Sequence, residues 1–276
     1  MIRNALICVT ILFLSATSNH ARANRCDAAE EFSRAAKKLD KTKQESLNVL
    51  ANVFKSGAKG QTAQCVDALF VSFRTFYYES LRRNEIPATV QDVDKVNSKL
   101  KQVGWKLHQS EGDYYVGEDG SWLLKEFGKY LSPSWLGYLT RREIEIEEGL
   151  FEDAALMISW EDLRERTTFW ESFRSKNPEF PLIKEISVDI SMYVKIMLTG
   201  IDNTSVESDS ILKKEVRAVY ERFLTQNKDS RYHTVVKGYY EILKKNGFRL
   251  NSESARFLKR NKIGSMFDNQ PPGNLQ

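Results

Sequence analysis

The chain has 276 residues, of which 41 are basic and 37 acidic, so its formal net charge is only +4. A balance this close to neutrality gives no electrostatic argument for nucleic acid, and we expect no nucleic-acid partner. The composition is that of an ordinary globular protein, long enough for one large domain or two small ones.

The first 23 residues have the layout of a secretory signal peptide. Arg3 supplies the positive start, residues 5–14 form a short apolar run, and Ala21 and Ala23 flank an A-x-A cleavage site. We expect cleavage after Ala23 and a periplasmic or secreted product. The apolar run is far shorter than the roughly 20 residues of a membrane-spanning helix, and no second long run follows, so we expect no transmembrane anchor.

Two cysteines, Cys26 and Cys65, remain once Cys8 has left with the signal peptide. In an exported protein they most simply form one disulfide, worth about 3–4 kcal/mol in the chain-entropy model. Two unpaired thiols are the alternative. Residues 23–25 before Cys26 do not match a lipidation site, which favours a free product.

Apolar residues recur at helical spacing along most of the mature chain. Asp27 with Glu30 predicts the capped start of the first helix, and Ser159 with Asp162 predicts another cap. The first helix can break near Asp40 and would have to do so for Cys26 to reach Cys65. Predicted helices cover residues 27–57, 62–84, 89–104, 120–131, 133–148, 160–176, 182–199, 209–226, 231–246 and 252–261.

Residues 105–118 differ from the rest, because they alternate weakly and are rich in strand formers, which predicts a small β-hairpin or an ordered loop. The expected organisation is therefore a signal peptide, a disulfide-stapled helical region, a helical-hairpin region and a disordered tail, covering residues 1–23, 24–104, 105–263 and 264–276.

An internal repeat with an offset of 50 residues relates residues 168–180 to residues 218–230. Both copies carry an aromatic residue, a glutamate, a phenylalanine and an asparagine in the same order. The run from Phe223 to Tyr232 resembles the turn between the two helices of tetratricopeptide-like repeats of bacterial envelope proteins. The first copy keeps the turn proline, Pro178, whereas the second has Lys228 there but keeps Ser230.

The resemblance covers residues 168–245, and its period of 50 exceeds the 34 residues usual for that family. It implies helical hairpins that stack and bind other proteins. We therefore expect an all-α fold whose helical hairpins form a solenoid-like array.

Signals for catalysis and for metal binding are sparse. His108 and His233 share no metal-ligand spacing with each other or with a cysteine, and no nucleophile-elbow, P-loop or dinucleotide motif is present. We therefore predict no metal and no cofactor, and we assign no catalytic residue.

Carboxylates are the one remaining resource for chemistry. Residues 140–165 hold nine acids, and helical spacing places Glu145, Glu148 and Glu152 roughly on one face. Paired acids could cleave a glycan or hold a hard cation, whereas a solvated helix face explains the same run without any function.

All five tryptophans fall within residues 105–170, where they could line a binding groove or form the core. The acidic, aromatic loop at 111–119 is the best candidate site, because function concentrates in such loops. The candidate ligand-binding residues are Asp113, Tyr114, Tyr115, Glu118, Asp119, Trp122, Glu152 and Asp153.

These observations favour an exported protein-interaction module of the cell envelope, whose partner is another protein or an envelope component. Two alternatives stay open. One is a carboxylate-dependent glycan hydrolase, which needs two carboxyl groups about 5–10 Å apart in a cleft. The other is a carrier of a small ligand, which needs a closed apolar cavity of about 300 Å³ or more.

Overall fold

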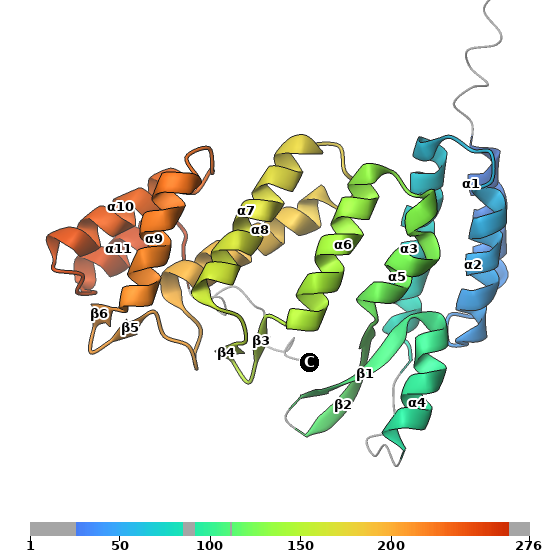
Figure 1. Ribbon diagram of the computed structural model, residues 1–276, viewed down its shortest axis with the longest axis horizontal. Helices are drawn as coiled ribbons and strands as arrows, with labels where there is room; N and C mark the ends of the chain where they lie inside the picture. The colour runs from blue at the N-terminus through green and yellow to red at the C-terminus, as the bar shows by residue number, and fades with distance from the viewer. Residues whose placement is uncertain (1–25, 85–91, 111, 265–276) are drawn as a thin grey trace, which may run out of the picture.

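The computed structural model describes residues 26–84, 92–110 and 112–264. The predicted signal peptide with its cleavage site lies outside these residues, as does the predicted tail apart from Gly264. Figure 1 shows helices standing side by side in one long row, with three small β-hairpins along one edge of the row. The described chain is mostly helical, in agreement with the predicted all-α class, and none of its helices is long and apolar enough to cross a membrane.

The N-terminal part is a group of helices that packs around α3. Its elements are α1 (Asp27–Lys38), α2 (Glu45–Gly57), α3 (Ala63–Leu81), α4 (Val93–Leu100) and the short 3-10 helix η1 (Lys101–Val103). Both α1 and α2 contact α3, and they bury Phe32, Leu50 and Phe54. The predicted break near Asp40 is confirmed, because α1 ends before that residue and α2 begins after it.

Cys26 and Cys65 form the predicted disulfide, which joins the start of α1 to the start of α3. Their Cα atoms lie 5.6 Å apart. The break after Lys38 lets α1 fold back along α2, which brings Cys26 next to α3. The predicted cap by Asp27 is wrong: Cys26 holds the N-cap position and makes no side-chain cap bond.

Residues 105–245 form three successive units, each a β-hairpin followed by two helices. The first contains β1 (Trp105–Ser110), β2 (Asp113–Glu118), α5 (Gly120–Phe127), the 3-10 helix η2 (Gly128–Tyr130) and α6 (Pro133–Glu148). The second contains β3 (Phe151–Glu152), β4 (Ala155–Leu156), α7 (Trp160–Lys176) and α8 (Ile183–Thr199). The third contains β5 (Glu207–Ser208), β6 (Ile211–Leu212), α9 (Lys214–Gln226) and α10 (His233–Lys245), and α11 (Ser252–Arg260) follows it.

The predicted hairpin at 105–118 is confirmed, with Trp105 opposite Glu118 and Ser110 opposite Asp113. The other two hairpins were not expected. Residues 209–213 were predicted to begin a helix, but α9 starts only at Lys214, because Asp209 and Ser210 form the turn between β5 and β6. Both residues have positive φ angles, of 53° and 63°, which no right-handed helix contains.

The two predicted repeat copies have the same local structure. The N–H of Asn177 donates to the carbonyl of Phe173 at 2.9 Å, and 50 residues later the N–H of Asn227 donates to the carbonyl of Phe223 at the same distance. Each asparagine ends the first helix of its unit, and its carbonyl then accepts a 3.1 Å bond from the residue three positions on. The sequence match therefore corresponds to one shared helix–turn–helix geometry.

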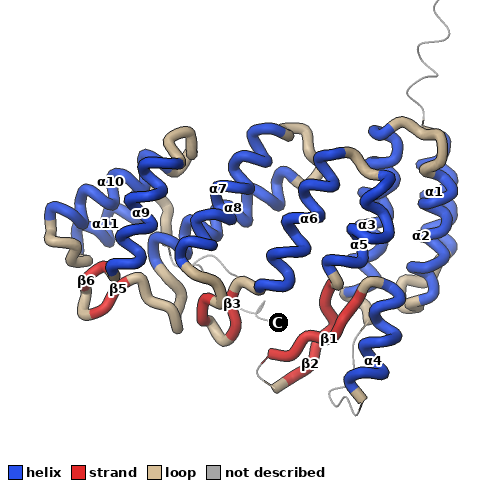
Figure 2. Tube along the Cα trace, in the orientation of Figure 1, coloured by secondary structure: helices blue, strands red, loops and turns tan. Residues whose placement is uncertain are grey.

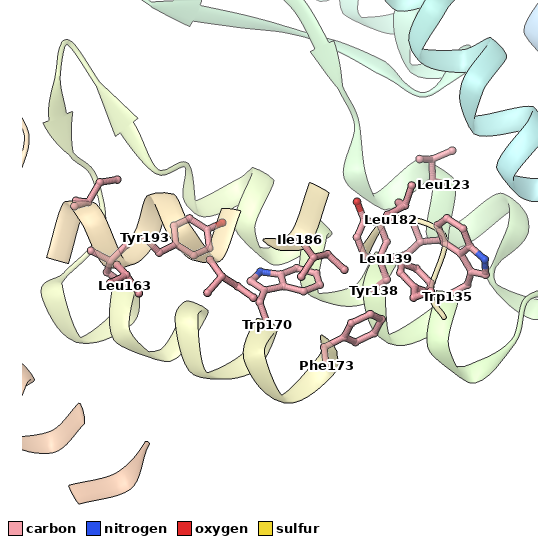
Figure 3. Packing of buried hydrophobic residues seen from close by; sticks show 14 of the residues in the cluster. Leu123, Trp135, Tyr138, Leu139, Leu163, Trp170, Phe173, Leu182, Ile186 and Tyr193 are labelled. Carbon is pink, nitrogen blue, oxygen red and sulfur yellow. The ribbon is translucent and has the colours of Figure 1, made fainter. Parts of the chain in front are cut away.

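The central tryptophans belong to the core. Trp105, Trp135 and Trp170 are almost completely buried, and Trp160 is only 9% exposed. Figure 3 shows Trp170 of α7 between Tyr193 of α8 and the aromatic side chains of α6. Core packing, rather than an open aromatic groove, thus accounts for these four side chains, and it joins the first unit to the second.

Candidate functional site

The three hairpins lie along the same edge of the row of helices (Figures 1 and 2). We call this region, residues 105–118, 151–157 and 207–212, the hairpin surface. It contains Asp113, Tyr114 and Tyr115 of the first hairpin, and Glu152 and Asp153 of the second, among the residues predicted to bind a ligand. Each hairpin contributes one turn to this edge of the molecule.

The second and third hairpins are held in place by the same device. In each, two residues of positive φ form the turn, as expected for a tight two-residue hairpin. The loop after the unit's second helix then bonds back to the hairpin. Asn203 donates its N–H to the carbonyl of Ala154 at 2.9 Å, and Leu250 donates to the carbonyl of Ser210 at 2.7 Å.

The hairpin surface exposes large apolar side chains. Tyr115, Phe151, Met157 and Ile211 are 52%, 45%, 54% and 43% exposed. Four further large apolar side chains of the described chain are exposed, and all of them lie on helices: Val49, Leu136, Ile144 and Val188. The hairpins hold half of these side chains in a small part of the chain, and apolar exposure concentrated in this way marks interaction sites.

Acidic side chains accompany these apolar residues. Asp113, Glu152, Asp153 and Asp209 are all exposed at or next to the hairpin turns. Glu147, near the end of α6, is also exposed and forms an ion pair with Lys106 of β1. The hairpin surface thus combines apolar side chains with an excess of negative charge.

The other three candidate residues, at the end of β2 and the start of α5, serve the fold. The Glu118 carboxylate accepts a hydrogen bond from the Tyr78 hydroxyl of α3. Asp119 is the N-cap of α5 and accepts from the N–H of Ser121 at 3.2 Å. Trp122 stacks on Tyr77, with ring centroids 6.0 Å apart. These three predicted site residues therefore have structural partners, whereas the other five face solvent in whole or in part.

No family model, curated protein or solved structure matches this chain.

Burial of Glu118 raises the pKa of its carboxyl, although the Tyr78 hydroxyl and nearby arginines act in the opposite direction. The folded protein therefore binds this proton more tightly than the unfolded chain does, so this site loses stability as the pH rises through the raised pKa. We expect Glu118→Gln, which stays neutral and keeps an acceptor for Tyr78, to lose less stability than the wild type between pH 4.5 and about pH 7.

Urea unfolding of both proteins at the two pH values measures this difference. Glu147→Gln, which alters an exposed carboxylate, is the control. If wild type and Glu118→Gln differ in free energy of unfolding by the same amount at both pH values, the expectation is contradicted.

The carboxylates of the central acidic run are engaged by neighbouring side chains. Glu145 is 4% exposed and accepts four hydrogen bonds. Its donors are Arg141, Arg142, Trp170 and Tyr193, at 2.8, 3.3, 2.8 and 3.3 Å. Glu148 bonds to Arg166 at 2.8 Å, and Glu152 lies on β3 rather than on the helical face predicted for it. With its oxygens engaged by four donors inside the core, Glu145 is placed as a structural anchor between helices rather than as a group free to meet a substrate.

A small pocket of about 220 Å³, lined by both apolar and charged side chains, lies next to Glu145, between α6, α7 and α8. Asp189 of α8 lines it across from Glu145, and Arg142 contacts both carboxylates. Burial raises the pKa of Asp189. No local pattern in the sequence singles out Asp189, Tyr193 or Arg166, because their partners come from another helix, α6.

The two histidines of the described chain both have partners. His108 stacks on Tyr115 at 5.2 Å, and the Nε2 atom of His233 lies 3.2 Å from the carbonyl oxygen of Leu224. Among the described residues, no group of three or more histidine, cysteine or acidic side chains is placed to hold a metal ion.

Proposed function

We propose that the protein is an exported protein-interaction module of the cell envelope and that the hairpin surface is where its partner binds. The observation that carries the proposal is the concentration of exposed apolar side chains on three hairpins that lie along one edge of the molecule. Exposed apolar side chains accompanied by polar groups are typical of protein–protein interfaces.

The repeated units support the same function. Each unit places its hairpin at the same edge, so successive units extend one surface rather than building separate ones. We propose that the row continues the stacking of tetratricopeptide-like helical hairpins in a solenoid-like array, an architecture whose extended faces bind proteins. Export through the predicted signal peptide would place this surface in the periplasm or outside the cell.

Two features weigh against the alternative functions. The buried carboxylate of the central run is saturated with donors, which disfavours a glycan hydrolase that uses it. Two hollows of the described chain, of about 770 and 700 Å³, are grooves open to solvent rather than closed apolar cavities. A carrier of a small apolar ligand needs a closed apolar cavity.

Affinity capture from the envelope extract of the source cells tests the proposal. The bait is the chain from residue 24 onward, compared with a variant in which the four apolar residues of the hairpin surface, Tyr115, Phe151, Met157 and Ile211, are changed to serine. We expect a specifically retained protein to bind this variant at least about 30-fold less tightly, since the loss of one interface hot spot alone costs about 2 kcal/mol or more.

The matched control changes the four exposed apolar residues of the helices to serine, namely Val49, Leu136, Ile144 and Val188. It alters the same amount of exposed apolar surface at other places. Equal retention by both variants, or equal loss in both, would show that the hairpin surface is not the binding site.

A further inference from the structure

The two strands of the first hairpin pair only with each other, so each has an outer edge that the other strand does not cover. In an antiparallel pair, residues whose N–H and C=O groups point at the partner strand alternate with residues whose groups point away. The bond from the N–H of Asp119 to the carbonyl of Gly104, at 2.8 Å, fixes this alternation. With the observed register, the backbone N–H and C=O groups of Tyr114, Val116 and Glu118 of β2 then point away from β1.

An independent contact on β1 confirms the assignment. Leu107 pairs with Val116, so its N–H must also point away from the partner strand. It donates to the Oδ1 atom of Asn97 in α4, at 2.7 Å. The outer edge of β1 is therefore covered by α4, which packs along it.

Within the described residues the outer edge of β2 is covered less: α3 contacts this strand, and its Tyr78 hydroxyl donates to the carboxylate of Glu118. The His108 ring lies beside Gly117, next to the outward position at Glu118. Among the described residues, neither Tyr114 nor Val116 has a hydrogen-bond partner for its outward N–H or C=O. Unpaired backbone groups in a row on an edge strand are a template for another strand.

The Asp113 end of this edge is acidic, whereas Arg74 and Arg142 act on Glu118 at its other end. Asp113 begins β2, and the exposed Glu152 and Asp153 lie on the neighbouring hairpin. Figure 1 shows the first hairpin between α4 and this second hairpin, so the strand that α4 leaves uncovered is on the side of these acids. The exposed Tyr115 adds an aromatic ring on the face that also carries His108.

We propose that β2 accepts an extended, lysine- or arginine-rich segment of the partner protein as a third strand. The backbone of that segment would bond to Tyr114 and Val116, its cationic side chains would meet Asp113, Glu152 and Asp153, and its apolar side chains would contact Tyr115. Main-chain bonds supply affinity in such strand addition, and the alternating side chains supply specificity. The inference rests on the proposed function and names the class of partner for the same surface.

Fluorescence anisotropy with a labelled peptide of alternating lysine and valine tests this. We expect binding that weakens as the salt concentration rises from about 50 to about 200 mM. A glutamate–valine peptide, and a lysine–valine peptide N-methylated at alternate residues, should each bind about tenfold more weakly, because the first reverses the charge and the second loses its backbone donors. Equal binding of the methylated and unmethylated peptides would overturn the proposal.

A pair of protein variants tests the same contact from the other side. Val116→Pro removes an N–H that points outward and leaves the bonds between β1 and β2 intact, whereas Val116→Ala shortens the side chain and keeps the N–H. We expect about tenfold weaker peptide binding for the proline variant than for the alanine variant. If Val116→Pro fails to fold, as judged by circular dichroism, the N-methylated peptide decides the matter with the wild-type protein.

Two further results separate the possible errors. A wild-type dimer in sedimentation that Val116→Pro dissociates would mean that β2 pairs with a second copy of the chain, and the proposal would be wrong. If capture of the natural partner depends on the four apolar residues of the hairpin surface but not on the Val116 N–H, strand addition fails and the proposed function stands. If capture depends on neither of these features, both strand addition and the proposed function are wrong.

Discussion

Replacement of Glu145 by alanine is expected to destabilise the folded protein by about 3–4 kcal/mol, because removal of one partner from a buried ion pair leaves the others without a counter-charge or acceptor. The carboxylate joins three helices: two donors come from α6 itself, one from α7 and one from α8. Trp170 and Tyr193 are almost fully buried, so loss of the carboxylate leaves their donors without their protein acceptor.

Urea unfolding followed by tryptophan fluorescence measures this loss. Glu147→Ala is the matched control, since it removes an exposed carboxylate and one surface ion pair from the same helix, and such pairs contribute no more than about 1 kcal/mol. Glu145→Gln, which keeps the size and one acceptor oxygen, should lie between the alanine variant and the wild type. Equal losses in free energy of unfolding for Glu145→Ala and Glu147→Ala would mean that the buried carboxylate contributes no more to stability than a surface carboxylate.

Removal of the disulfide by Cys26→Ser with Cys65→Ser is expected to cost about 3–4 kcal/mol in the chain-entropy model. The two cysteines are 39 residues apart, and their bond closes a loop that contains α1, α2 and the turn between α2 and α3. Without it the unfolded chain gains freedom, and α1 keeps only its packing against α2 and α3.

Denaturant unfolding of the oxidised wild type, the reduced wild type and the double variant checks this expectation. The reduced wild type and the double variant should have the same lower midpoint, and added reductant should leave the double variant unchanged. Coincident midpoints for all three samples would show that the bond adds no stability.

Helix ends with local signals could be predicted to the residue. Ser159 and Asp162 form the predicted capping box at the start of α7, and Ser132 caps α6 with Pro133 at its first position. These signals act within a single turn of helix, so the sequence alone contains them. The break after α1 and the hairpin of β1 and β2 were likewise visible in the order of apolar and turn residues.

The two shorter hairpins could not be predicted in the same way. Strands of two residues are too short for an alternating pattern, and each hairpin is fixed by a loop about 40–50 residues further along the chain. The one local signal for the third hairpin was the run of Ser208, Asp209 and Ser210, which is typical of a turn but was included in a helix.

Contacts between distant segments also explain the site residues that the sequence did not indicate. Tyr193 reaches Glu145 across 48 residues, and Arg166 reaches Glu148 across 18. Similarly, the free edge of β2 depends on where α4 packs, which no pattern within residues 113–118 records. The candidate residues Asp113, Tyr115, Glu152 and Asp153 were selected for exposure and chemistry, which are properties of single residues.

The loops after α8 and α10 each bond back to the hairpin of their own unit, and this affects the order in which parts of the chain unfold locally. The second hairpin is bonded to residues 203–204 and the third to residues 248–250, so neither depends on the other for its closure. Contacts between these units include those of α7 with α9 and several hydrogen bonds. Asn227 donates to Thr168 and accepts from Arg164, and further bonds run from Tyr220 to the carbonyl of Met197, from Arg222 to Glu161 and from Ser230 to Glu171. The C-terminal unit can therefore unfold while the hairpin before it stays closed, so local opening proceeds in steps along the row rather than all at once.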